Sequence, residues 1–324
     1  MNNAQSIESA GRFKRALGRP ALSHLRILIP LLLLCLVFSI LSPYFFTVNN
    51  LFTVILESSI TSIVASGQAL VIMTGGIDLS VGSVMALTTV IVGEMLSVGL
   101  PLPLVIVAAL LSGSIVGLVN GILITRGKIA PFIATLGTYS AINGLALIVS
   151  NATPIPVENM PLMSLGSGYL GPVPIASVVT LIVVIVAHIL LRHNPFGTYV
   201  LAIGGSEQAA KMAGIHTRFN RTMVYVLCSL LATVGGIILT GRLGSAEPTA
   251  GGSYMLDSVA AVVMGGVSLF GGEGSIVGPV LGSLILGVLL NGLSLLGVSS
   301  NYQPIAEGVV IVLAVLMGQL RKGR

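Results

Sequence analysis

Polar side chains that could do chemistry are rare in this sequence, and those inside its long apolar runs are mostly neutral. The candidates nearest the middle of such runs are Gln68, Thr74, Asn120, Asn143 and Asn291. Amide and hydroxyl groups at this depth can line a passage for a neutral hydroxylated solute, or they can hydrogen-bond a neighbouring helix. Both interpretations stay open, and we take these five residues as candidates for a translocation pathway.

The carboxylates give a second clue. Glu57, Glu94 and Glu307 fall within apolar runs, towards the ends that we place outside, and Asp78 falls at an inner edge. A carrier driven by protons or sodium ions is expected to keep a titratable cluster near the middle of the membrane. The sequence offers no such cluster, which counts against an ion-coupled secondary carrier, the alternative function.

Signatures of catalysis are missing as well. The sequence has no GxxxxGK[ST] phosphate-binding loop. Its histidines, His24, His188, His193 and His216, lack the spacing of metal ligands. We therefore expect no catalytic residue, no metal site and no cofactor in this chain.

Helices that cross a membrane must position these candidates. Only 8% of the residues are charged and 54% are hydrophobic, with a mean hydropathy of +1.03, whereas a soluble domain has about a quarter charged residues. A crossing helix needs roughly 20 apolar residues. We therefore predict an all-α polytopic membrane protein with about ten spans: 27–41, 54–73, 79–98, 102–124, 132–149, 173–191, 223–240, 258–269, 276–296 and 305–320. The eighth is short and flanked by glycine, so it is either a complete span or a broken, re-entrant helix.

The distribution of positive charge orients these spans. With both termini in the cytoplasm, all fifteen basic residues except Arg242 lie on the cytoplasmic side, as the positive-inside rule requires. The predicted organisation is a basic tail over residues 1–26, a single transmembrane domain over 27–320 and a basic tail over 321–324. The net charge of +5 is too small and too dispersed to favour a nucleic-acid partner.

The cytoplasmic loop over residues 192–222 contains one ordered piece. Ser206 is a suitable N-cap for a short helix over 207–213, and Gly214 can close that helix in a left-handed conformation. Glu207 lies at the positive end of the helix dipole and Lys211 near the negative end. A helix of this length does not persist on its own. It is therefore either a contact for a cytosolic partner or an ordinary connector.

The longest external loop, Asn151 to Pro172, is rich in proline and glycine. This composition predicts turns and irregular structure. The loop then either caps the helix ends or forms part of a docking surface.

Several segments carry a resemblance to a known family. The most specific are GGIDLSVGS at 75–83 and AIGGSEQAAKMAGI at 202–215, within a similarity that extends from Leu41 to Met317. The chain resembles the ribose-type permeases of bacterial ABC sugar importers. The resemblance implies a subunit of the bacterial inner membrane that imports a monosaccharide, with ribose first among several candidate sugars.

The resemblance also implies partners and a mechanism. It implies a homodimer in the membrane lipid, a cytoplasmic ATPase that binds the ATP, and a periplasmic sugar-binding protein. The family's coupling loop corresponds here to Gly204, Gly205, Ser206, Glu207, Ala209, Ala210 and Gly214. Movement of this loop would rock the spans between inward-open and outward-open states. On position alone, Arg242, Glu247 and Asp257 are candidates for contact with the binding protein. A membrane scaffold that transports nothing is the third hypothesis.

Overall fold

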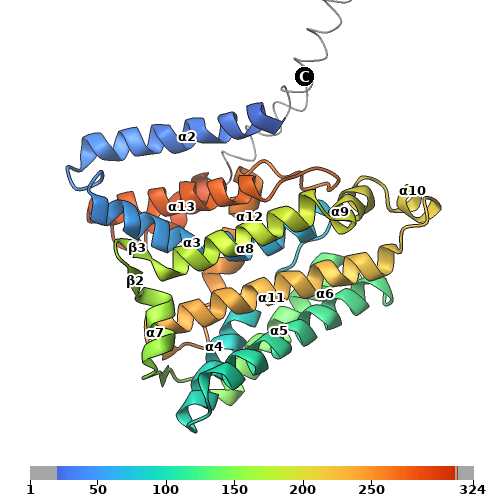
Figure 1. Cartoon of the computed structure of the whole chain (residues 1–324), viewed down its shortest axis with the longest axis horizontal. Helices are drawn as coiled ribbons and strands as arrows, with labels where there is room; N and C mark the ends of the chain where they lie inside the picture. The colour runs from blue at the N-terminus through green and yellow to red at the C-terminus, as the bar shows by residue number, and fades with distance from the viewer. Residues whose placement is uncertain (1–19, 311, 313–324) are drawn as a thin grey trace, which may run out of the picture.

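The computed structural model describes residues 20–310 and 312. Its helices pack side by side, most of them along one common direction (Figure 1). Their bounds are α2 (Pro20–Leu41), α3 (Val48–Met73), α4 (Val81–Ser97), α5 (Leu102–Thr125), α6 (Pro131–Val149), α7 (Met160–Ser167), α8 (Ile175–Arg192), α9 (Pro195–Gly205), α10 (Glu207–Met212), α11 (Thr217–Leu243), α12 (Gly252–Met264) and α13 (Val277–Leu295). The predicted helical architecture is confirmed for this part of the chain.

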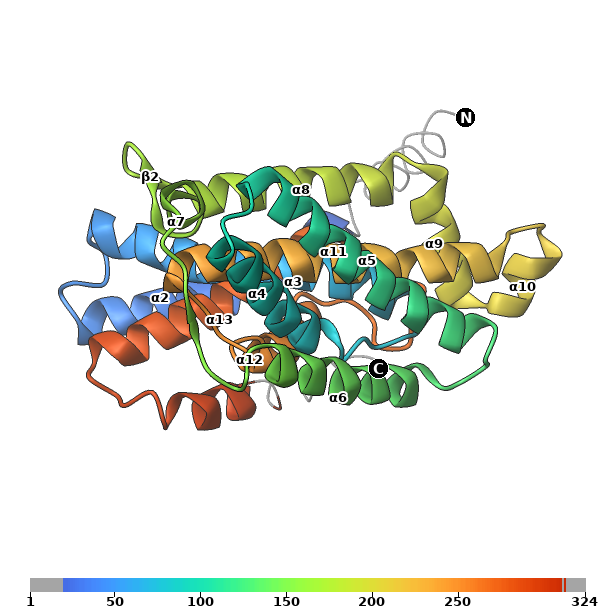
Figure 2. The ribbon, with the colours of Figure 1, turned by 90° about the horizontal axis from the view of Figure 1, so that it is seen from below.

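The core forms around α3 and α11, which lie at the centre of the bundle in both ribbon views (Figure 2). Every residue of α3 from Ser58 to Met73 is buried. Helix α11 packs against α3, α4 and α5. The outer faces of α5, α6 and α8 expose large aliphatic side chains such as Leu111, Ile133 and Val186. In a membrane these faces meet lipid, so the bundle is apolar both inside and outside.

Six described helices are long and apolar enough to cross a membrane: α3, α5, α6, α8, α11 and α13. Three shorter apolar helices accompany them, over Ile27–Leu41, Val81–Ser97 and Gly252–Met264. Helix α2 begins at Pro20, before the predicted boundary at residue 26. Helices α3 and α11 also begin about one and a half turns before the predicted starts at 54 and 223. Most of the tenth predicted span, 305–320, lies outside the described residues.

The predicted bounds of the eighth span are wrong. Helix α12 runs from Gly252 to Met264 and has 13 residues, about 20 Å of helix against a hydrocarbon layer of about 30 Å. It stops there because Gly266 takes a left-handed conformation with φ of +75°. An irregular segment then leads to α13 and is partly buried, as Val267 and Ile276 show.

The outer loop is more regular than its composition predicts, so the expectation of irregular structure is corrected. It contains α7, whose N-cap Asn159 accepts a hydrogen bond from the Leu162 backbone N–H at 3.1 Å. Two short antiparallel pairs flank α7: β1 (Ile155–Pro156) with β4 (Ser245–Ala246), and β2 (Tyr169–Leu170) with β3 (Val173–Pro174). Tertiary burial stabilises this helix, because Gly166 and Gly241 let α7 and α11 meet at backbone distance.

Candidate functional site

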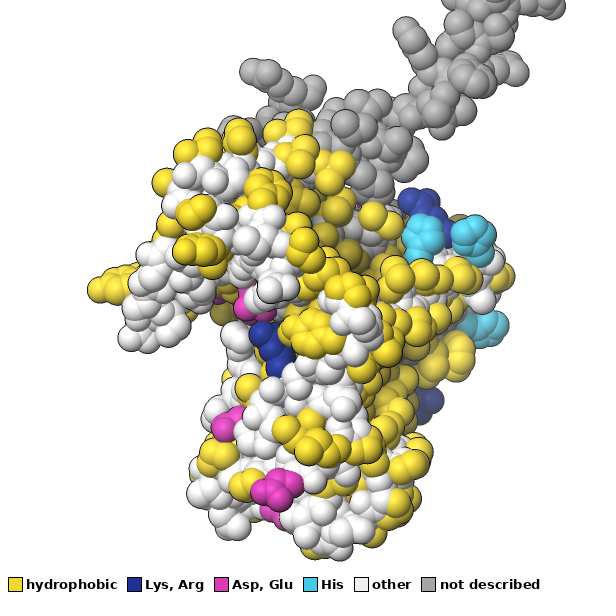
Figure 3. Space-filling view, turned by 60° about the vertical axis from the view of Figure 1, so that its left-hand side comes forward, with side chains coloured by type: hydrophobic (Ala, Val, Ile, Leu, Met, Phe, Trp, Pro, Cys, Tyr) yellow, Lys and Arg dark blue, Asp and Glu magenta, His cyan; other side chains and the backbone are white. Residues whose placement is uncertain are grey.

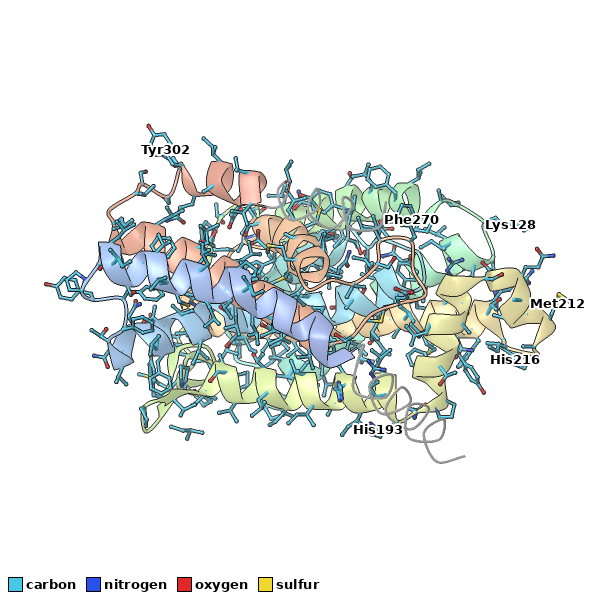
Figure 4. All side chains as sticks on the ribbon, turned by 90° about the horizontal axis from the view of Figure 1, so that it is seen from above. Lys128, His193, Met212, His216, Phe270 and Tyr302 are labelled. Atoms are coloured by element: carbon cyan, nitrogen blue, oxygen red, sulfur yellow. The ribbon has the colours of Figure 1, made fainter. Side chains whose placement is uncertain are left out.

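Helix α10 lies at one end of the bundle, beyond the ends of the long helices (Figure 1). Lys128, Met212 and His216 lie at this end, and Tyr302 lies at the opposite end (Figure 4). Met212 is 84% exposed, so the tip of α10 faces away from the bundle. We call the segment formed by α9 and α10, residues 195–212, the α9–α10 arm.

The local structure of α10 is as predicted. The hydroxyl of Ser206 accepts a hydrogen bond from the Ala209 backbone N–H at 3.2 Å. At the other end Gly214 is left-handed with φ of +82°. The Ala210 side chain is buried and anchors the helix. The helix ends at Met212, one residue before the predicted end. Its coupling role stays a prediction.

Glu207 is the electrostatic centre of the arm. Its carboxylate pairs with the Lys211 ammonium at 2.6 Å and with the Arg221 guanidinium at 2.9 Å. Thr217 donates a longer hydrogen bond to it at 3.5 Å. The hydrogen bond from Lys211 and the positive charges of Arg221 and Lys211 hold the pKa of Glu207 below its usual range. Glu207 is therefore ionised at neutral pH, and α10 is bound to α11 by a charge-assisted contact.

Two adjacent glycines of the arm have different surroundings. A methyl group at Gly204 would collide with the carbonyl oxygen of Met73 and the amide nitrogen of Gly272, whereas one at Gly205 would meet nothing within 4 Å. The Gly272 N–H donates to the Met73 carbonyl at 2.9 Å. Gly204 therefore lies directly on the hydrogen bond that joins the end of α3 to the α12–α13 connection. The family resemblance implies one coupling role for both glycines, whereas their packing differs.

A cluster of buried polar groups lies deeper in the bundle. Oδ1 of Asp78 accepts hydrogen bonds from the Ser80 backbone N–H at 2.8 Å and from its hydroxyl at 2.6 Å. The Asn120 amide of α5 donates to the Ser80 hydroxyl at 2.8 Å. With its amide group oriented so that both atoms find partners, Gln68 of α3 donates to the Asp78 carbonyl and accepts from the Asp78 backbone N–H, both at 3.2 Å. Two predicted pathway residues, Gln68 and Asn120, thus meet through one connection, residues 74–80.

Asp78, which the sequence places at an inner edge of the membrane, is enclosed by protein, and its depth in the membrane stays a prediction. The residue is fully buried, and Gly76 of the same connection lies against the Tyr225 hydroxyl. Tyr225 lies eight residues after Thr217, about 12 Å along α11. Residues 74–80 therefore re-enter the bundle, as irregular backbone does only where protein buries it.

Of the other three predicted pathway residues, Thr74 begins the same connection, whereas Asn143 and Asn291 lie on other helices. Thr74 caps α3, and its hydroxyl bonds the Val71 carbonyl at 2.8 Å. Asn291 of α13 exchanges two amide hydrogen bonds of 2.9 Å with Asn50 of α3. Asn143 is half-buried on α6. Their role in a pathway stays a prediction.

Of the three predicted docking residues, Arg242 lies near the end of α11 that is remote from α10, and Glu247 follows that helix. Arg242 forms a long ion pair of 3.9 Å with Glu57 of α3. The Glu247 carbonyl accepts a hydrogen bond from the Thr89 hydroxyl at 2.9 Å. Asp257 is half-buried on α12. The face turned forward in Figure 3 shows acidic side chains in separate places around one basic side chain. Their contact with a binding protein stays a prediction.

Sequence reasoning missed Arg221. Predicting that the seventh span begins at residue 223 left this arginine in a loop, whereas α11 begins at Thr217. Its second guanidinium nitrogen, Nη2, donates to the Thr74 carbonyl at 2.9 Å. The spacing of Thr217, Arg221 and Tyr225 by four residues was the available signal, because it places the three on one helix face.

Comparison with known proteins assigns the chain to a family. Residues 50–315 match the family described as "Branched-chain amino acid transport system / permease component". The chain belongs to this permease family. It is accordingly a multi-pass protein of the bacterial inner membrane and a transport component rather than an enzyme.

Individual members of the family are similar to the chain over most of its length. The chain is 45% identical to the ribose import permease protein RbsC of Escherichia coli (strain K12), over 90% of this chain and 92% of the relative. It is 41% identical to RbsC of Haemophilus influenzae, over 98% of this chain and 97% of the relative. It is 44% identical to RbsC of Bacillus subtilis (strain 168), over 89% of this chain and 90% of the relative. No solved structure matches the chain significantly.

Proposed function

We propose that this chain is the membrane-spanning subunit of an ABC importer that carries a monosaccharide, ribose or a similar pentose or hexose, inward across the membrane. The observation that carries this proposal is the similarity to ribose import permeases over about nine-tenths of both chains. The arm supports it, because a short charged helix that projects beyond the bundle offers a surface to a cytosolic partner. ATP is bound by that partner, a cytoplasmic ATPase, and this chain needs no cofactor.

The proposed mechanism is alternating access. Closure of the ATPase pair displaces α10 and with it the coupling loop, which consists of Gly204, Gly205, Ser206, Glu207, Ala209, Ala210 and Gly214. The displacement shifts α3 and α11, to which the arm is bound, and so rocks the bundle between inward-open and outward-open states. A periplasmic sugar-binding protein supplies the specificity, which lets the passage bind sugar weakly.

The assembly that fits this mechanism is a homodimer of about ten-span subunits with both termini in the cytoplasm. The end that carries α10 then faces the cytoplasm and the opposite end faces the binding protein, for which Arg242, Glu247 and Asp257 are the candidate contacts. The polar residues Gln68, Thr74, Asn120, Asn143 and Asn291 serve the passage or the contacts between its helices.

Reconstitution tests this function. We expect proteoliposomes that contain the chain, its ATPase and sugar-loaded binding protein to accumulate labelled ribose when ATP is supplied on the ATPase side. Omitting the ATPase, the binding protein or ATP should abolish accumulation, because the chain has no energy source of its own.

The same vesicles separate the alternatives. Uptake by the chain alone under a proton or sodium gradient would refute the proposal in favour of an ion-coupled secondary carrier. Absence of flux with all components and a panel of pentoses and hexoses would instead support a scaffold.

A further inference from the structure

Arg221 joins three elements that the sequence places far apart. One end of its guanidinium, Nη1, donates to Glu207 of α10 at 2.9 Å. The other end, Nη2, donates to the carbonyl of Thr74 at the end of α3, also at 2.9 Å. The Arg221 side chain is only 19% exposed. A single planar group on α11 therefore fixes the arm and the end of α3 at the same time.

The chemistry of both contacts favours arginine specifically. The last carbonyls of a helix lack partners within the helix and form the negative end of its dipole, so a cation there is favourable. The guanidinium holds its donors in a rigid fork, which binds two acceptors at a set separation. Lysine carries a compact charge on a flexible stem and does not reproduce this geometry.

The Thr74 contact leads directly to the interior of the bundle. Thr74 begins the connection over residues 74–80, and Asp78 and Ser80 of that connection hold the polar cluster together. Tyr225, one turn after Arg221, packs its hydroxyl so closely against Gly76 that a methyl group there would collide with it. A shift of Arg221 relative to α3 therefore displaces the connection that sets where α4 begins.

We propose that Arg221 is the positioning residue that carries a displacement of α10 to the connection between α3 and α4. The inference rests on the proposed function, because it takes α10 as the segment that the ATPase moves. It goes further by naming the contact through which that movement reaches the interior. Such a route is supported when the coupling energy between pairs of residues along it, here Glu207 and Arg221, is measured.

The test measures sugar imported per ATP hydrolysed in proteoliposomes with ATPase and binding protein. We expect Arg221→Gln to lower this ratio about tenfold, within the usual range of coupling between sites, while binding of the ATPase is unchanged. Arg218→Gln is the matched control, because Arg218 is exposed on the preceding turn of the same helix. It should keep the wild-type ratio.

A double-mutant cycle then tests the pair. Glu207→Gln also removes the contact with Lys211. The double variant is therefore needed to isolate the interaction energy between Glu207 and Arg221. We expect Glu207→Gln combined with Arg221→Gln to lower the ratio less than the product of the two single effects. If Arg221→Gln does not insert into the membrane, Arg221→Lys takes its place and should show a reduced ratio.

The outcomes separate this inference from the proposed function. A wild-type assembly without ATP-dependent uptake would refute the function itself. A working wild-type assembly in which the Arg221 variant matches Arg218→Gln, or in which the two single effects simply multiply, would overturn the inference alone.

Discussion

Replacing Gly204 by alanine is expected to disable the protein, whereas the same change at Gly205 is expected to leave it intact. The new methyl group at Gly204 would collide with backbone atoms of Met73 and Gly272, which cannot move aside as a flexible side chain can. It would also disturb the hydrogen bond between these two residues. Overpacking lowers the free energy of unfolding by about 1–3 kcal/mol. Loss of a buried hydrogen bond lowers it by about 1–3 kcal/mol more. We expect a clear fall in the thermal unfolding midpoint in detergent and loss of ATP-driven uptake.

Gly205→Ala is the matched control, because it adds the same methyl group to the neighbouring residue in open space. Alanine is favoured over glycine in a helix by about 0.5–1 kcal/mol, so this variant should be as stable as the wild type or slightly more stable. Equal behaviour of the two variants, whether both active or both inactive, would contradict the described packing of α9 on α3.

Replacing Asp78 by alanine should have the second largest effect. The change removes the acceptor for the Ser80 N–H and hydroxyl and leaves both polar groups buried without it. A buried donor that loses its acceptor costs about 1–3 kcal/mol. Two such losses at the start of α4 should lower the unfolding midpoint and reduce the yield of monodisperse protein.

Asp78→Asn separates hydrogen bonding from charge. Asparagine keeps a side-chain oxygen for Ser80 and removes the cost of burying a carboxylate. We expect this variant to unfold close to the wild-type midpoint. If it were as damaging as Asp78→Ala, the charge rather than the acceptor geometry would hold the connection, and the account of this cluster would fail.

Most of the fold could be predicted from the sequence because long apolar runs have few alternatives in lipid. The 3.6-residue period was not needed, since length and hydropathy alone predicted the long helices such as α5 and α13. Short capped elements were predictable for a different reason. Ser206 and Gly214 are residues whose local backbone preferences determine where α10 begins and ends.

The parts that escaped prediction depend on tertiary burial. The sequence does not show that protein encloses Asp78, because the connection over residues 74–80 folds back against Gln68 only in the packed bundle. Helix α7 exists because two glycines let it meet α11 at backbone distance. Hydropathy places Arg221 in a loop, because polar residues at the start of α11 conceal that part of the helix. The five pathway candidates could not be grouped in advance for the same reason.

A cross-linking measurement tests most directly whether the arm receives energy from a cytosolic ATPase. Met212→Cys places a thiol on the exposed tip of α10, and Tyr302→Cys places one at the opposite end, where Tyr302 is 64% exposed. The unaltered chain, with its own Cys35 and Cys228, gives the background. We expect a thiol-reactive cross-linker to join the ATPase to the Met212→Cys variant, with a yield that changes when ATP is added, and not to the Tyr302→Cys variant. An assembly that imports sugar while its ATPase links to Met212→Cys no better than to Tyr302→Cys would contradict the account.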